Sequence, residues 1–199
     1  MMLIEQTTVP DAALPVQALK DHLRLGTGFT DAGMQDALIR GYLRAAMAAI
    51  EGRTGKALIA RRFLLQLEDW RTPSDQALPL APVSALVAVT LVNVANVATV
   101  VNPALYRLVQ DSHRPRLTGV GYLLPTVPVE GRIEVVFDAG FGAAWANVPP
   151  DLGQAVLLLA AEYYDRRNEL GEAVAGLPFA VQVLIEKWRT VRVLGGGAA

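Results

Sequence analysis

Residues 149–169 constrain the fold more than any other stretch, because they predict one long helix with two different halves. Pro150 suits the first helical position, where the amide hydrogen that proline lacks would be unpaired anyway. Residues 155–161 are apolar around the whole circumference, which predicts a helix buried on every side. The helix then becomes charged, with Glu162 and Arg166 spaced to pair across one turn.

The length and composition limit what the chain can be. Its 199 residues suffice for one domain with a real core, or for one domain that carries an insertion. Basic and acidic residues nearly balance, at 18 and 19, so any contact with DNA must be local. The absence of cysteine excludes disulfides and thiolate nucleophiles. We see no signal peptide pattern and no apolar run of membrane length, so we expect a cytosolic product without a membrane partner.

Apolar residues recur at helical spacing in three further segments. Residues 15–25 predict a short amphipathic helix, and a longer helix begins near residue 30 and ends near Thr54. Gly55 is a natural left-handed cap for that longer helix. Residues 177–188 predict the last helix.

Between the second helix and the central one, the periodicity changes to the alternation that is typical of strands. Alternation or β-branched character marks six short segments, at residues 62–67, 83–94, 98–101, 106–109, 116–118 and 132–138. In the last of them, Ile133, Val135 and Phe137 face one way and charged residues face the other. This stretch therefore predicts a small antiparallel β unit inserted between helices.

We expect an α+β fold. It combines a helical bundle (two N-terminal helices, one central buried helix and one C-terminal helix) with the inserted β unit and an extended C-terminal tail. The expected boundaries are residues 1–56 and 141–190 for the helical core, 57–140 for the β unit and 191–199 for the tail.

Side chains that could carry out chemistry are few and scattered. The two histidines, His22 and His113, have no ligand-spaced partners, whereas a metal site needs three or four converging ligands. Asp111 lies two residues before His113, so a hydrolytic site near this pair is one alternative. The sequence shows no nucleophile elbow, and we expect neither enzymatic activity nor a bound cofactor or metal.

Two apolar segments lie where the pattern predicts a loop and a chain end, at residues 119–129 and 191–194. Exposed apolar patches usually mark surfaces that bind a partner. Each of the two segments therefore either contacts a partner or folds back on the β unit and the helices.

The order and spacing of several sequence blocks carry a resemblance to a known family. These blocks lie at residues 19–24, 50–58, 78–83, 102–107, 135–142, 148–152, 155–159, 164–169, 177–181 and 188–189. The most specific piece combines VPPDL at residues 148–152, AVLLL at residues 155–159 and YDRRNE at residues 164–169. The chain resembles the head–tail connector (adaptor) proteins of tailed phages, and most closely the adaptor of the gene transfer agents of alphaproteobacteria.

The resemblance implies a homo-oligomeric ring of twelve copies, docked below the portal protein in the neck of a phage-like particle that is assembled in the bacterial cytoplasm. It also implies that helices surround a channel that DNA crosses without sequence-specific contacts, and that the C-terminal segment reaches the portal. Loops at the other end would hold the next neck ring, a stopper or head-completion protein. The residues implied at these contacts are Arg166 and Arg167 at the channel or the ring interface, Arg189, Val191, Arg192, Val193 and Leu194 at the portal, and Tyr122, Leu123 and Leu124 at the next ring.

The main alternative is a DNA-binding module. Five basic residues lie on or just after the two C-terminal helices, namely Arg166, Arg167, Lys187, Arg189 and Arg192. Heavy phosphate contact would make DNA binding tight and salt-dependent, whereas a near-neutral chain suits a channel through which DNA slides.

Overall fold

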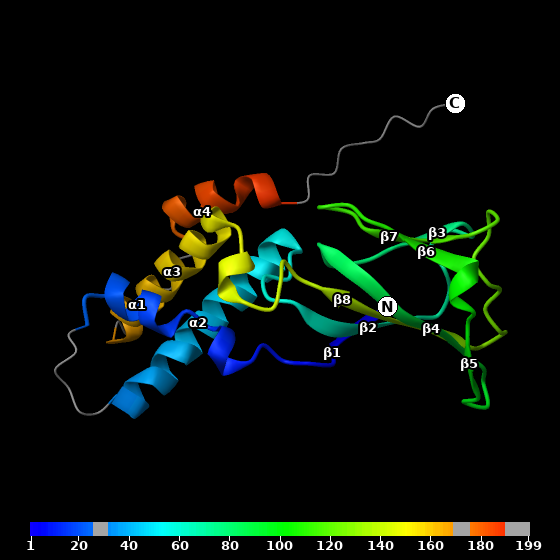
Figure 1. The fold of residues 1–199 in the computed structure, drawn as a ribbon, viewed down its shortest axis with the longest axis horizontal. Coiled ribbons are helices and arrows are strands. Elements are labelled where there is room, and N and C mark those ends of the chain that lie inside the picture. Colours follow the sequence, from blue (N-terminus) through cyan, green and yellow to red (C-terminus); the bar gives the residue numbers. More distant parts are fainter. Residues whose placement is uncertain (26–31, 169–175, 190–199) are drawn as a thin grey trace.

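The computed structural model describes residues 1–25, 32–168 and 176–189, which fold as the α+β class that the sequence predicts. Helices gather at one end of an elongated molecule and strands at the other (Figure 1). The helices are α1 Val16–His22, α2 Ala32–Thr54, α3 Pro150–Asp165 and α4 Phe179–Ile185. The strands are β1 Met2–Glu5, β2 Arg61–Leu67, β3 Asp75–Ala77, β4 Val83–Val92, β5 Ala98–Val100, β6 Tyr106–Val109, β7 Arg116–Gly119 and β8 Arg132–Ala139. None of the described helices is long and apolar enough to cross a membrane.

The helical end is built on the packing of α2 against α3 (Figure 1). Leu43 and Ile50 of α2 share one buried cluster with Leu152, Val156 and Leu159 of α3. Packing removes the apolar faces of both helices from water, which favours folding by roughly 25 cal/mol for each Å² of apolar surface that is buried. The helical layer therefore has a core of its own.

The end of α2 is the one predicted from the sequence. Gly55 adopts a φ of 66°, in the left-handed region that glycine enters without strain. Its N–H donates to the carbonyl oxygen of Glu51 at 2.8 Å, which closes the last turn.

The central helix, α3, begins at Pro150 as expected, but it is not buried on every side. Leu157 and Leu158 are only partly buried, although the residues on either side of them are fully buried. The reason is that α1, α2 and α4 all pack against α3 yet leave part of its circumference uncovered. The apolar run thus predicted the core position of α3 correctly and its complete burial wrongly.

The C-terminal helix is fastened to the first turn of α3 through Asp151. This carboxylate accepts hydrogen bonds from Trp188 Nε1 at 2.7 Å and Leu152 N–H at 3.0 Å, and it pairs with Lys187 Nζ at 2.8 Å. Burial raises the pKa of Asp151, but these contacts outweigh burial and hold the pKa below its usual value of 3.8. Residues 177–188 form not one helix but α4 followed by the 3₁₀ turn Glu186–Trp188.

The larger sheet has the strand order β1-β2-β8-β4-β5, and all of its pairs are antiparallel. The alternation predicted for β8 is confirmed, because Ile133, Val135 and Phe137 are fully buried. Phe63 of β2 stacks on Phe137 with ring centres 5.8 Å apart. Strand β1, which the sequence pattern did not predict, adds an edge by pairing with β2.

The smaller sheet has the order β3-β7-β6 and lies beside the larger one at the same end of the molecule (Figure 1). Tyr106 and Leu117 of the smaller sheet share a buried cluster with Val89 and Val135 of the larger. The described residues thus hold two buried clusters, one mainly helical and one made by the sheets. The division into a helical core (1–56 and 141–190), a β unit (57–140) and a tail (191–199) stays a prediction.

Candidate interaction surfaces

Lys56 lies where the helical end meets the sheets, directly after the cap of α2. Its side chain is fully buried, and its Nζ donates to the carbonyl oxygen of Ser112 at 2.7 Å. The same Nζ lies 3.3 Å from His113 Nδ1. Burial lowers the pKa of Lys56, and the nearby charge of Asp111 offsets this lowering only in part. A buried lysine with such partners ties the end of α2 to the loop between β6 and β7.

A second tie between the two ends is an ionic cluster. The Glu51 carboxylate accepts from Leu58 N–H at 2.7 Å and from Arg61 Nη2 at 2.6 Å. Arg61 Nε also lies 3.0 Å from the carboxylate of Glu5 in β1. Only 8% of the Arg61 side chain is exposed, so this cluster is largely shielded from water. It joins α2, β1 and β2.

The neighbourhood of His113 is a turn and not a reaction centre. The Asp111 carboxylate accepts from the backbone N–H groups of His113 and Arg114, at 2.6 and 2.7 Å. These hydrogen bonds hold the pKa of Asp111 below its usual value. A carboxylate that caps a turn in this way has a structural task. Among the described residues, no group of His, Asp and Glu is arranged to hold a metal ion.

The basic residues of the C-terminal helices are engaged by their own neighbours. Arg166 Nε pairs with Glu162 at 2.7 Å, as its spacing predicts. The Arg167 guanidinium donates to the Tyr164 carbonyl oxygen at 2.6 Å and lies 4.1 Å from the centre of that ring.

The last turn before the tail repeats this pattern. Arg189 Nη1 lies 3.1 Å from the carboxylate of Glu186, and slightly more than half of the Arg189 side chain is exposed. Of the five residues expected at the portal, Arg189 is the one that the structure describes. The other four, Val191, Arg192, Val193 and Leu194, lie outside the described residues.

The three candidate residues of the apolar loop after β7 differ in exposure. Tyr122 is 89% exposed and Leu123 is 64% exposed, whereas Leu124 is buried at 6%. Leu124 belongs to the core shared by the sheets, so its side chain does not present a surface for a partner. The loop comes so close to β7 that a Cβ on Gly119 would lie 2.3 Å from the Leu123 carbonyl oxygen. Only glycine fits there without a shift of the backbone.

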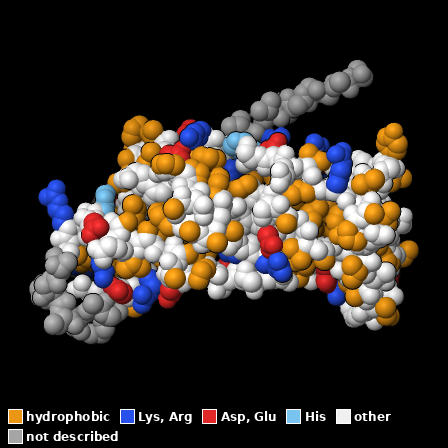
Figure 2. Space-filling view, viewed as in Figure 1, with side chains coloured by type: hydrophobic (Ala, Val, Ile, Leu, Met, Phe, Trp, Pro, Cys, Tyr) orange, Lys and Arg blue, Asp and Glu red, His pale blue; other side chains and the backbone are white. Residues whose placement is uncertain are grey.

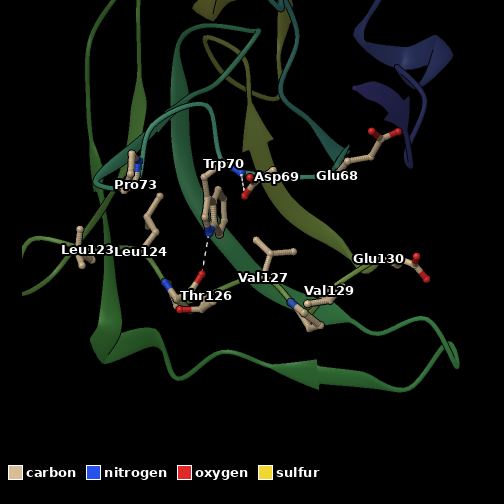
Figure 3. A pocket seen from close by; sticks show the side chains of 12 residues that line it. Glu68, Asp69, Trp70, Pro73, Leu123, Leu124, Thr126, Val127, Val129 and Glu130 are labelled. Atoms are coloured by element: carbon tan, nitrogen blue, oxygen red, sulfur yellow. Dashed lines mark hydrogen bonds between the residues drawn. The ribbon is translucent and has the colours of Figure 1, made fainter.

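This loop forms one wall of a groove of about 480 Å³ that the sequence did not reveal. Figure 3 shows Trp70, which follows β2, standing against the segment from Leu124 to Val127. Trp70 Nε1 donates to the Pro125 carbonyl oxygen at 2.8 Å, which fixes the ring in the groove. Three carboxylates also line the groove, those of Glu68, Asp69 and Glu130. The groove therefore combines apolar side chains with three carboxylates.

No protein-family model and no curated protein matches the chain. Among solved structures, a chain in the neck of an empty gene transfer agent particle, computed with C6 symmetry, is 56% identical, with a TM-score of 0.89. The match covers 98% of this chain and 99% of that chain.

Two further structures agree with this match, and each again covers 98% of this chain and 99% of the other. One is the neck of a native gene transfer agent particle computed with C12 symmetry, at 52% identity and a TM-score of 0.84. The other is the virion of a native gene transfer agent particle, at 56% identity and a TM-score of 0.85.

Such a fold, matched along its whole length by components of a particle neck, defines a structural protein and not an enzyme. The chain belongs to the neck (adaptor) proteins of gene transfer agent particles, which confirms the resemblance found in the sequence.

Proposed function

We propose that this neck protein forms a ring of twelve copies that joins the capsid portal to the next neck ring of a phage-like, DNA-delivering particle. The observation that carries the proposal is the 56% identity, over 98% of the chain, to a protein in a particle neck. The matching necks were computed with C6 and C12 symmetry, and both symmetries are compatible with twelve copies.

The two ends of the molecule give the ring its direction. The helical end carries Arg189 and leads into the tail, and this side contacts the portal. An extended apolar tail can add a strand to the edge of a partner sheet, which gains backbone hydrogen bonds with little demand on sequence. At the other end, Tyr122 and Leu123 are exposed beside the Trp70 groove, and this side contacts the stopper or head-completion ring.

The ring encloses a channel that DNA crosses without sequence-specific contacts. Arg166 and Arg167 are the candidates for the channel wall or the ring interface. Both are held by neighbours within the same chain, and the net charge of the chain is −1. A wall of this kind binds phosphate weakly and lets DNA slide. These pairings count against the alternative of a DNA-binding module.

Imaging of particles from cells that lack this chain tests the proposal. We expect capsids without an attached neck or tail, because the ring is the joint between them. The full chain restores tailed particles when it is supplied again. If particles without this chain still carry complete necks, the proposed function is wrong.

Truncation tests the portal side separately. A chain that ends at Thr190 keeps its fold, measured by circular dichroism and thermal unfolding, but fails to join the portal. A matched control ends at Leu194 and removes only the Gly- and Ala-rich end, and we expect it to assemble normally. Normal assembly of the shorter chain would show that the tail does not dock.

A gel shift at moderate salt tests the passive channel. We expect no retention of duplex DNA by the free protein, whatever the DNA sequence. Retention that depends on the DNA sequence would favour the DNA-binding module instead.

A further inference from the structure

One segment of the sheet end carries no charge at all. Residues 76–106 contain no Asp, Glu, Lys or Arg, although these residues make up 19% of the chain. The segment includes the hairpin of β4 and β5, which exposes four valines: Val87, Val94, Val97 and Val100. We call these four residues the valine edge. Figure 2 shows hydrophobic side chains gathered over the end of the molecule where β5 lies.

The backbone of β5 also presents a free edge. Asn93 N–H donates to the Val97 carbonyl oxygen at 3.1 Å, and Val101 N–H donates to the Val89 carbonyl oxygen at 2.8 Å. In an antiparallel pair, every second residue points its N–H and C=O groups toward the partner strand. Val97 and Val101 point toward β4, so Ala98 and Val100 point their backbone groups away from it.

Edge strands of this kind are usually protected by charged residues or proline, since an open edge pairs with other chains. Strand β5 has neither, because its three residues are Ala98, Thr99 and Val100. All three are exposed. An exposed edge without charge or proline is open to pairing with another strand.

The opposite edge of the same sheet is β1. Gln6, which follows β1, points toward β2, because its N–H donates to the Arg62 carbonyl oxygen at 2.8 Å. By the same alternation, Leu3 and Glu5 point their backbone groups away from β2. Met2 and Leu3 are also exposed, at 52% and 37%. The molecule therefore has two open, largely apolar strand edges on opposite sides of one sheet.

The pairing register places these two edges at the same height. One continuous row of paired residues crosses the sheet from Met2 through Gln66, Glu134 and Thr90 to Val100. Because all four pairs are antiparallel, β1 and β5 run in the same direction. A neighbouring copy related by rotation can thus bring its β1 alongside β5 as a parallel pair.

We propose that β5 of one copy pairs with β1 of the next copy, so that the large sheet continues from subunit to subunit around the ring. The inference rests on the proposed ring and names the surfaces that build it. A closed ring of identical chains needs two different, complementary surfaces on each chain, and β1 and β5 supply them. The partner of the valine edge is therefore a second copy of this chain.

Cysteine pairs test this contact cleanly, because the chain has no cysteine of its own. In the variant M2C/V100C, the row from Met2 to Val100 continues across the subunit boundary and brings the new thiols within reach of each other. We expect purified particles, treated with a mild oxidant or a short bismaleimide, to give a ladder of linked chains on a denaturing gel. The single variants M2C and V100C should run as single chains on the gel, because the facing edge then carries no second cysteine to link to.

The other outcomes overturn the proposal. Dimers from either single variant would mean that like edges meet. A linked band that contains another neck protein would mean that the edge belongs to a different partner. If the double variant stays monomeric in particles whose necks show a complete ring by imaging, the ring uses other surfaces and the proposed function survives. Absence of a ring from wild-type particles would overturn both proposals.

A charged substitution on β5 provides a second test of the contact. Val100→Lys puts a charge at the contact, and we expect particles without this ring. The matched control is Val183→Lys, at an exposed valine of α4 at the helical end, and it should still give a ring. Complete rings from Val100→Lys would count against the contact as clearly as a missing ladder.

Discussion

The helical end and the sheet end of the molecule differ in how charged and apolar residues are distributed on their surfaces. At the helical end, exposed cations such as Arg166 and Lys187 pair with carboxylates of the same chain. At the sheet end, residues 76–106 have no charge, and valines such as Val94 and Val100 lie open. The difference shows that charges of the helical surface are paired within one chain, whereas the sheet edge offers an uncharged apolar surface that we propose a neighbour covers. Substitutions should therefore separate into those that lower stability and those that prevent assembly.

The largest loss of stability should come from the ionic cluster that joins the two ends. Glu51→Ala leaves the buried Arg61 guanidinium with Glu5 as its remaining carboxylate, and it removes the acceptor of Leu58 N–H. Removal of one partner from a buried pair typically costs about 3–5 kcal/mol, and we expect a loss near the lower end of that range in urea unfolding. The control is Glu186→Ala, which breaks the exposed pair with Arg189 and should leave stability near that of the wild type. Equal losses from both variants would contradict a special role for the cluster.

A core substitution in the helical layer comes next. Leu43 of α2 is fully buried, so Leu43→Ala should lower the free energy of unfolding by about 3 kcal/mol through lost burial and the cavity left behind. Leu38→Ala, on the same helix at a site that is 46% exposed, should change it by less than about 0.5 kcal/mol. Chemical denaturation measures both. A small effect at Leu43 would mean that the helical layer contributes little to the fold.

A smaller effect should appear as pH dependence at the helical end. The folded-state pKa of Asp151 lies below the unfolded value, so its stabilisation is complete above the usual value of 3.8 and is lost as pH falls through the folded pKa. Asp151→Asn removes this contribution, which we expect to be about 1.5–2 kcal/mol, near the lower end of the range for hydrogen bonds to a charged group. Thermal unfolding between pH 2 and pH 7 should show a flatter profile for the variant. Profiles of the same slope would exclude Asp151 as a source of acid sensitivity.

The smallest effect on the folded chain should come from the sheet edge. The double variant V94S/V97S replaces two exposed valines of the hairpin and should change the free energy of unfolding by less than about 1 kcal/mol. It should also lower self-association of the free protein, measured by light scattering, because the apolar edge is less attractive. The control Val183→Ser, at an exposed valine of α4, should leave self-association unchanged. A large loss of stability would show that the edge serves the fold itself.

Periodicity in the sequence was sufficient to predict the long helices and the long strand β8. Pro150 marks the first residue of α3, and Gly55 caps α2, as predicted. The alternation in β8 was confirmed because one face of that strand packs into the core. Strands β1 and β3 were not predicted, since each is short and exists only through pairing with a distant partner.

The candidate surfaces were less accessible to sequence reasoning. Leu124 and Leu123 are chemically alike, but the close approach of Gly119 and the positive φ of Tyr122 turn one inward and leave the other exposed. The groove arises from two segments that lie far apart in the chain, so Trp70 gave no local signal. The uncharged stretch at residues 76–106 was visible in the sequence and could have indicated the valine edge.

The buried Lys56 has a mechanical consequence. It follows the last turn of α2 directly, and its hydrogen bond to Ser112 spans from the helices to the loop of the smaller sheet. Ala57 N–H and Ala81 N–H add two more bonds across the same joint, each 3.0 Å long. The bond from Ala81 N–H ends on the carbonyl oxygen of Gly55 itself, so a bend between α2 and the sheets at Gly55 would have to break it. This bond resists bending between the helical end and the sheet end, and in the proposed ring it would keep the two ends of each subunit at a fixed spacing.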